Sequence, residues 1–408
     1  MNDNNNNPLI ARISDGFEAA KAGRALEICK EVSGYHDSGQ LPAVSHYPFG
    51  WIIYYALHQT PDSDILSRKH LLARYLRLNV KKPHKLHSMI LTEAIRLYRD
   101  ARNAAFNSSG QSPRFSILEF AKLWNMANLR PGDWRRKEHE GKTMSSTAEK
   151  LITLAVDEIE QSRREPSADF IAVIDKAVAE FPDSYNLLSQ RATLFILAGQ
   201  REAARRLLRK ALLLAPGKFY LWSRMASVVT VEENPRLRVA LLWRALSAPG
   251  QEQFKGRVRL QLADTWLKLG MHGYALWELT RVRQVYEAGQ WHLPAAWKAD
   301  MARIPADTAM VDPAGVYARL SSLADDEIYS ELPEIRVRKT YHKHPDPNNS
   351  RPGYGRPAVA WRLTDDSGRN YWIQPHRFSL HPDLPIGTQL LIRIVEGRAV
   401  KVRFLVDE

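Results

Sequence analysis

The sequence of residues 184–216 reads SYNLLSQRATLFILAGQREAARRLLRKALLLAP. Apolar and small residues recur in it at the three- and four-residue steps of an amphipathic helix, in two runs separated by Gly199 and followed by Pro216. Small residues let two helices approach to about 8–10 Å, glycine permits the turn between them, and proline ends the second helix. The stretch therefore predicts a pair of antiparallel helices.

The spacing within this stretch resembles that of the tetratricopeptide repeat. The residues that carry the resemblance are Leu188, Ala192, Phe195, Gly199, Ala204, Leu208, Ala211 and Pro216. An alanine of the first helix recurs at positions 155, 192, 226 and 263, at spacings of 37, 34 and 37 residues. Such a period predicts stacked helix pairs. An irregular helical bundle is the alternative interpretation.

Length and composition place the chain among ordinary globular proteins. It has 408 residues, of which 44% are hydrophobic and 25% charged, which is enough for two or three domains. The single cysteine, Cys29, excludes an internal disulfide and a zinc site built from thiolates. The polar start lacks the pattern of a signal peptide, and no apolar run approaches the length of about 18 residues that spans a membrane. We therefore expect a cytoplasmic protein.

The pattern is helical from Leu9 to about Ala324 and requires no strands there. After Asp326, proline, glycine, asparagine and β-branched residues become more frequent, and five short runs have the pattern of strands. These runs are residues 334–342, 357–364, 370–374, 389–395 and 399–406. We expect a mainly α protein of tetratricopeptide-like helical repeats with a small C-terminal, five-stranded, OB-like (S1/cold-shock-like) β-barrel. The expected segments are a disordered N-terminus (1–9), an N-terminal helical domain (10–144), the repeats (145–325) and the barrel (326–408).

The chain is strongly basic, with 58 Lys and Arg against 45 Asp and Glu, a net charge of +13. Residues 201–260 hold 13 basic and 4 acidic residues, and residues 334–408 hold 13 and 8. The positive electrostatic field of so basic a chain favours binding of polyanions, so nucleic acid is the first partner to consider. In the repeats, Arg205, Arg206 and Arg209 follow one another along a helix and are candidate phosphate contacts. A solvated helix face, or a surface for acidic protein segments, is the alternative there.

Strand alternation sorts the residues of the barrel onto two faces. The expected outer face carries Arg336, Arg338, Trp372, Gln374, Arg393, Lys401 and Arg403. Trp361 shares its parity with Val359 and Leu363 and should lie in the core. An exposed aromatic ring among cations suits single-stranded DNA or RNA, which stacks its bases and presents phosphates. The alternative is an ordinary solvated face.

The C-terminal stretch resembles a cold-shock or S1-type domain. The likeness rests on Trp361, on the Asp365-Asp366-Ser367-Gly368 turn and on Tyr371-Trp372-Ile373-Gln374, although residues 357–361 lack the glycine-interleaved aromatics of that family's first motif. The resemblance implies that Trp372 is a stacking aromatic and that Gln374 takes the place of the family's histidine.

The chain as a whole resembles the accessory proteins of prokaryotic TOTE conflict systems. The likeness includes residues 49–55 (FGWIIYY), residues 71–76 (LLARYL) and Leu86-His87-Ser88, followed by the repeats and the barrel. It implies a role in antiviral defence against invading nucleic acid. It also implies polymerase and helicase subunits as protein partners, docked through the helical repeats.

The sequence contains no phosphate-binding glycine loop, H-E-x-x-H helix or G-x-S-x-G elbow, which are signatures of enzymes. His342, His344 and Asp346 lie close together in sequence but lack further ligands for a metal. We therefore expect no enzyme, no cofactor and no metal site. The sequence predicts a non-catalytic nucleic-acid-binding adaptor. The alternative is a pure protein-protein interaction scaffold whose barrel packs on a partner subunit.

Overall fold

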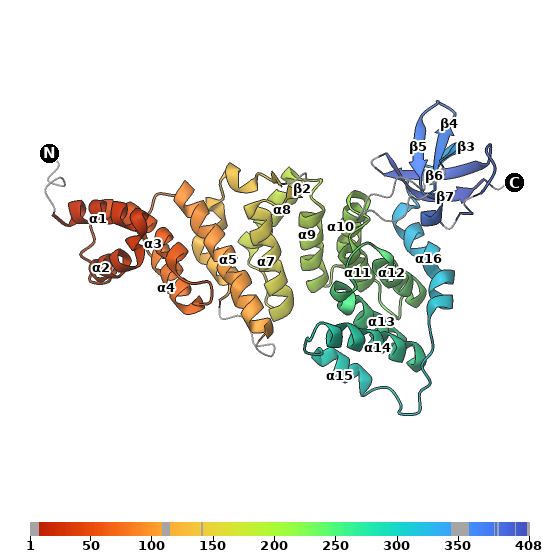
Figure 1. Ribbon diagram of the computed structural model, residues 1–408, viewed down its shortest axis with the longest axis horizontal. Helices are drawn as coiled ribbons and strands as arrows, with labels where there is room; N and C mark the ends of the chain where they lie inside the picture. The colour runs from red at the N-terminus through yellow and green to blue at the C-terminus, as the bar shows by residue number, and fades with distance from the viewer. Residues whose placement is uncertain are drawn as a thin grey trace, which may run out of the picture. The chain divides into compact units, whose positions relative to one another are not determined.

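The computed structural model describes residues 8–107, 115–139, 142–343, 359–378, 380–381, 383–395 and 397–405. The chain divides into two compact units, Met1–Pro182 with Thr193–Gly199, and Asp183–Ala192 with Gln200–Glu408 (Figure 1). Residues 1–7 of the expected disordered start, and His344 and Asp346, lie outside the described residues. Within the described ranges, no helix is long and apolar enough to cross a membrane.

The first unit is built from helices and one small hairpin. Its helices are α1 (Pro8–Ala19), η2 (Ala20–Arg24), α2 (Ala25–Asp37), η3 (Ala43–Ser45), α3 (His46–Gln59), α4 (Ile65–Leu76), α5 (Lys85–Asn107), α6 (Ile117–Trp124), η4 (Met126–Asn128), η5 (Pro131–Trp134), α7 (Thr147–Ser162) and α8 (Ala168–Glu180). The hairpin pairs β1 (Lys137–His139) with β2 (Lys142–Met144). The expectation that this region holds no strands was therefore wrong, because strands of 3 residues are too short to show an alternating pattern.

The second unit begins with helices that pack as consecutive pairs, α11 against α12 and α13 against α14. Its helices, with α9 shared between the units, are α9 (Tyr185–Leu197), α10 (Arg201–Leu214), α11 (Phe219–Val228), α12 (Pro235–Ser247), η6 (Glu252–Lys255), α13 (Gly256–Lys268), α14 (His272–Ala288), α15 (Ala295–Met301) and α16 (Ala314–Tyr329). The alanines that set the period, Ala192, Ala226 and Ala263, are each 0% exposed. Gly199 and Gly270 permit the turns before α10 and α14 with φ angles of 73° and 70°.

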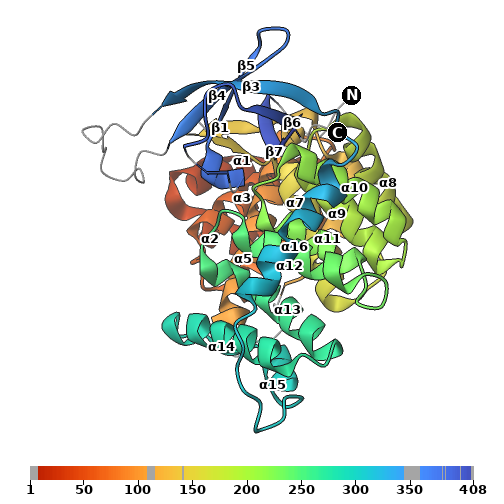
Figure 2. The ribbon, with the colours of Figure 1, turned by 90° about the vertical axis from the view of Figure 1, so that its right-hand side faces the viewer.

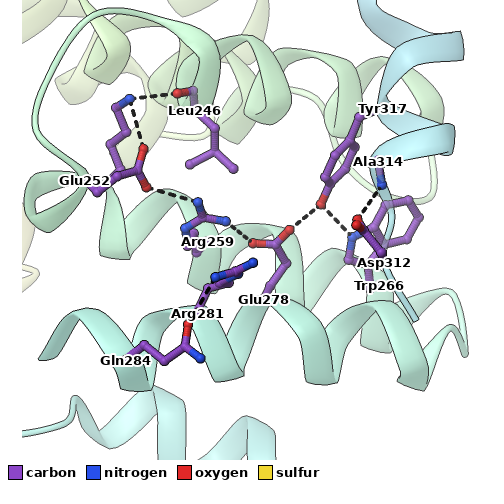
Figure 3. Close-up of polar contacts among 11 residues, drawn as sticks. Leu246, Glu252, Arg259, Trp266, Glu278, Arg281, Gln284, Asp312, Ala314 and Tyr317 are labelled. Carbon is purple, nitrogen blue, oxygen red and sulfur yellow. Dashed lines mark hydrogen bonds and ion pairs between the residues drawn. The ribbon is translucent and has the colours of Figure 1, made fainter. Parts of the chain in front are cut away.

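Helix α16 packs along α12 and α10 and leads into the sheet (Figure 2). A buried polar chain fixes its first half (Figure 3). The Tyr317 hydroxyl donates to Glu278 Oε1 at 2.6 Å, and Glu278 Oε2 accepts from Arg259 at 2.8 Å. Trp243 of α12 stacks on Tyr317 with ring centroids 4.5 Å apart. Because Glu278 and Tyr317 are both buried, these contacts hold α16 firmly on α12, α13 and α14.

The C-terminal part is a curled, five-stranded antiparallel sheet that forms a half-barrel. Its strands are β3 (Ile335–Lys343), β4 (Ala360–Asp365), β5 (Asn370–Ile373), β6 (Gln389–Val395) and β7 (Arg398–Phe404), with a short helix, η7 (Pro375–Phe378), after β5. The strand order is β5-β4-β3-β6-β7, and the two edge strands β5 and β7 contact each other. The mainly helical fold with a small C-terminal five-stranded β domain is thus confirmed.

The core of the half-barrel follows the predicted alternation. Trp361 is 0% exposed and packs with the side chains of Val337, Leu363, Tyr371, Ile373, Leu390 and Ile392. Trp372 is 55% exposed. The sequence-based assignment of one tryptophan to the core and the other to the surface is confirmed.

Replacing Trp361 with alanine should therefore lower the free energy of unfolding by about 3–5 kcal/mol, because the change leaves a large cavity. Trp372→Ala should change it by less than about 0.5 kcal/mol, because the ring lies at the surface. Urea denaturation followed by circular dichroism measures both. Equal losses in the two variants would contradict the assignment.

Candidate nucleic-acid interface

The outer face of the half-barrel has two halves with different surroundings. We call the part formed by β6 and β7 the docked half; it carries Arg393, Lys401 and Arg403. We call the part formed by β3, β4 and β5 the open half; it carries Arg336, Arg338, Tyr341, Arg362 and Trp372.

Basic residues of the docked half bind acidic and carbonyl groups of α16 and of the segment that follows it. Arg393 donates to the Tyr329 carbonyl and, at 3.2 Å, to Glu334 Oε1. Arg403 makes two hydrogen bonds to Glu334, at 2.9 and 2.6 Å, and Lys401 forms an ion pair with Asp326. These three residues lie on the outer face of the sheet, as predicted. Their ion pairs and hydrogen bonds hold the half-barrel against α16 and the segment after it.

Hydrogen bonds from Arg403, and then from Arg393, hold the pKa of the Glu334 carboxyl below its ordinary value. Glu334 therefore stays ionised at neutral pH and neutralises part of this basic surface. Burial lowers the pKa of Lys401.

A row of three side chains crosses the open half. Tyr341 of β3 lies opposite Arg362 of β4, and Arg362 lies opposite Trp372 of β5. The Arg362 guanidinium is 5.5 Å from the centroid of the Tyr341 ring. The Tyr341 and Trp372 rings meet edge to face, with centroids 6.1 Å apart, and are 45% and 55% exposed. The row presents two exposed aromatic rings with the half-buried Arg362 between them.

A β-bulge at Thr340 brings Tyr341 into this row. Lys339 pairs with Leu363 and Tyr341 with Arg362, so Thr340 is the extra residue. Its hydroxyl accepts a hydrogen bond from Arg362 Nε at 3.2 Å and lies 2.8 Å from the Thr364 hydroxyl, which fixes the bulge. Simple alternation would place Tyr341 on the core side with Val337, so sequence reasoning missed it. Arg362 has the parity of an outer residue, like Trp372, and could have been found.

The other predicted residues of the open half occupy two different settings. Arg336 and Arg338 are exposed on β3, and Arg338 lies opposite Thr364, next to the row. Gln374 is half-buried just beyond the end of β5.

The three predicted arginines of α10 separate onto two sides of that helix. Arg205 makes two hydrogen bonds to Glu327 of α16, at 2.8 and 2.7 Å. Arg209 bonds Glu327 at 3.2 Å and also pairs with Glu331. Arg206 is exposed. Two of the three candidate phosphate contacts thus face α16, and one faces solvent.

No group of three or more potential metal-ligating side chains gathers among the residues that the structure describes.

Residues 187–324 match the family model of a domain of unknown function, DUF7017. The match covers most of α9 and continues into α16, and the half-barrel lies outside it. No curated protein matches the chain. The molecule is thus a mainly helical protein in which residues 187–324 are similar to the DUF7017 domain and a five-stranded antiparallel half-barrel follows.

Arg205→Met should lower the free energy of unfolding by about 1–3 kcal/mol, because Glu327 loses two hydrogen bonds from a charged donor in a half-buried place. Lys210→Met, an exposed change on the same helix, is the matched control and should cost less than about 0.5 kcal/mol. The urea midpoint reports both variants. If they unfold alike, the pairing of α10 with α16 does not stabilise this unit.

Proposed function

We propose that this protein is a non-catalytic adaptor that binds single-stranded DNA or RNA on the open half of its half-barrel. The observation that carries the proposal is the Tyr341–Arg362–Trp372 row. Two exposed rings, on the strands that flank β4, offer surfaces on which bases stack, and each stacked base contributes about 1–3 kcal/mol. The guanidinium between them can bind a phosphate or stack on a base.

The place of the row supports the proposal. Strands β4 and β5 are the second and third strands of the five-stranded half-barrel. In OB-folds, the face of the second and third strands is the one that binds oligonucleotides. The cold-shock and S1-type resemblance independently implies a stacking role for Trp372.

Charge beside the row supports it as well. Arg336, Arg338 and Lys343 are exposed along β3. A strand whose bases stack on the row would bring its phosphates near these cations, and neutralising phosphates gives affinity that does not depend on sequence.

In this proposal the helical repeats dock protein partners. The resemblance to TOTE accessory proteins suggests polymerase or helicase subunits in a prokaryotic anti-phage system. The adaptor would then hold a single strand beside an enzyme that acts on it.

One observation favours the second candidate, a pure interaction scaffold. The docked half already holds acidic groups through Arg393, Lys401 and Arg403. The open half could bind an acidic partner surface by the same ionic chemistry, with Tyr341 and Trp372 as apolar anchors.

Trp372→Ala should weaken the binding of a labelled single strand by about 1–3 kcal/mol, or about 5- to 150-fold, because it removes one stacking surface. Phe404→Ala, which removes a 47% exposed ring on β7 outside the row, should leave binding unchanged. Fluorescence anisotropy with DNA and RNA strands measures both variants. Normal binding by a folded Trp372→Ala protein would reject the row as the site, whereas absence of strand binding by the unmodified protein would favour the scaffold.

Affinity should also fall with salt, by about 0.7 log units per tenfold salt for each phosphate that the protein neutralises. Arg338→Gln should reduce that slope by about one such step, because Arg338 lies beside the row. Arg403→Gln should leave the slope unchanged, because Arg403 is bonded to Glu334. A slope near zero in the unmodified protein would contradict any contact with phosphates.

A further inference from the structure

A pocket lies in the first unit where η5 approaches the end of α8. Trp134, the last residue of η5, stacks on Phe181, which follows α8, with ring centroids 5.4 Å apart and planes inclined by 20°. The cavity beside this pair has a volume of about 480 Å³. That volume falls within the range of about 300–1,000 Å³ that is usual for small-molecule sites.

The turn that presents Trp134 is fixed from both sides. The buried Asp133 carboxylate accepts hydrogen bonds from Ser88 Oγ and from the Arg130 backbone N–H, each at 2.8 Å. On the other side, Arg136 Nε donates to both carboxylate oxygens of Glu149, at 3.2 and 3.1 Å. The stacked Trp134–Phe181 pair is therefore held in place without a ligand, and little conformational freedom would be lost on binding.

Two exposed cationic side chains line the pocket together with the Trp134–Phe181 pair. Arg135 and Lys176 line the pocket and are exposed. Two carboxylates line the pocket. That of Glu149 accepts hydrogen bonds from Arg136 and from the Ser146 backbone N–H at the start of α7, whereas Glu180 is exposed. The pocket thus offers an aromatic surface and two exposed cations within one cavity.

We propose that this pocket binds one nucleotide unit, with the base against the Trp134–Phe181 pair and the phosphate between Arg135 and Lys176. Stacking takes any base, and the guanidinium of Arg135 suits the oxygens of a phosphate. A free nucleotide and a nucleotide within a single strand share this chemistry. The site lies in the first unit and does not depend on the half-barrel.

A comparable cavity in the second unit is less suited to an anion. It has a volume of about 350 Å³ and is lined by Trp243 and Trp277. Its lining also includes the three carboxylates of Glu252, Glu278 and Asp312. Arg259 is committed to two of them, Glu278 at 2.8 Å and Glu252 at 3.0 Å (Figure 3).

The test uses the full chain and calorimetric titration with AMP. Lys176→Glu should weaken AMP binding by at least about tenfold, because it removes a cation from the phosphate and adds a charge of the same sign as the ligand. Arg135→Gln should weaken it in the same direction. Lys30→Glu, the same charge change at an exposed position on α2, should leave binding unchanged. Absence of AMP binding, or equal effects of Lys176→Glu and Lys30→Glu, would overturn the proposal.

Trp134→Phe provides a readout specific to the site. AMP should quench tryptophan fluorescence in the unmodified protein, and Trp134→Phe should abolish most of that quenching while AMP still binds. Quenching that persists in this variant would place the nucleotide elsewhere.

Trp372→Ala separates this site from the half-barrel. The variant should bind AMP normally whether or not the half-barrel binds nucleic acid. An octanucleotide that still binds Trp372→Ala, and binds it more weakly once Lys176→Glu is added, would identify a strand as the source of the nucleotide. AMP binding that is lost in Trp372→Ala alone would contradict an independent site.

Discussion

The last turns of α16 carry three consecutive acidic residues, Asp325, Asp326 and Glu327, and the arrangement of the second unit depends on how they are paired. Acidic groups near a helix C-terminus are unfavourable unless cations neutralise them. Asp325 pairs with Arg244 of α12 at 3.0 Å and Glu327 with Arg205 of α10, while Asp326 pairs with Lys401 of β7. Because successive residues of a helix point about 100° apart, one turn can contact both sides.

This pairing decides what the half-barrel can do. A short segment connects α16 to β3. The ion pairs that hold α16 in place therefore also determine that β6 and β7, rather than β4 and β5, carry the residues bound to it. Arg393, Lys401 and Arg403 bind α16 and the segment after it, whereas Tyr341 and Trp372 stay exposed on either side of the half-buried Arg362. The net charge of +13 therefore overstates the surface offered to a polyanion, because many of these cations have acidic partners within the same chain.

Local periodicity predicted much of the fold and part of the site. Alternation placed Trp361 inside and Trp372 outside correctly, because one sheet face packs on the core and the other does not. Alternation failed at Tyr341, because the extra residue of the bulge moves the following side chains of β3 to the opposite face of the sheet. A bulge has no clear signature in a single sequence. Periodicity could not predict the partners of Arg205 and Lys401, because both depend on the docking of α16. Glu327, the partner of Arg205 on that helix, lies 122 residues further along the chain.

Photo-crosslinking tests most directly whether the open half binds a single strand. An iodouracil-substituted single strand, bound to the full chain and irradiated, marks the aromatic residues that its bases touch, and mass spectrometry of the peptides locates them. Crosslinks are expected at Tyr341 and Trp372. Crosslinks to the bound strand that are absent from both β3 and β5 would contradict this expectation.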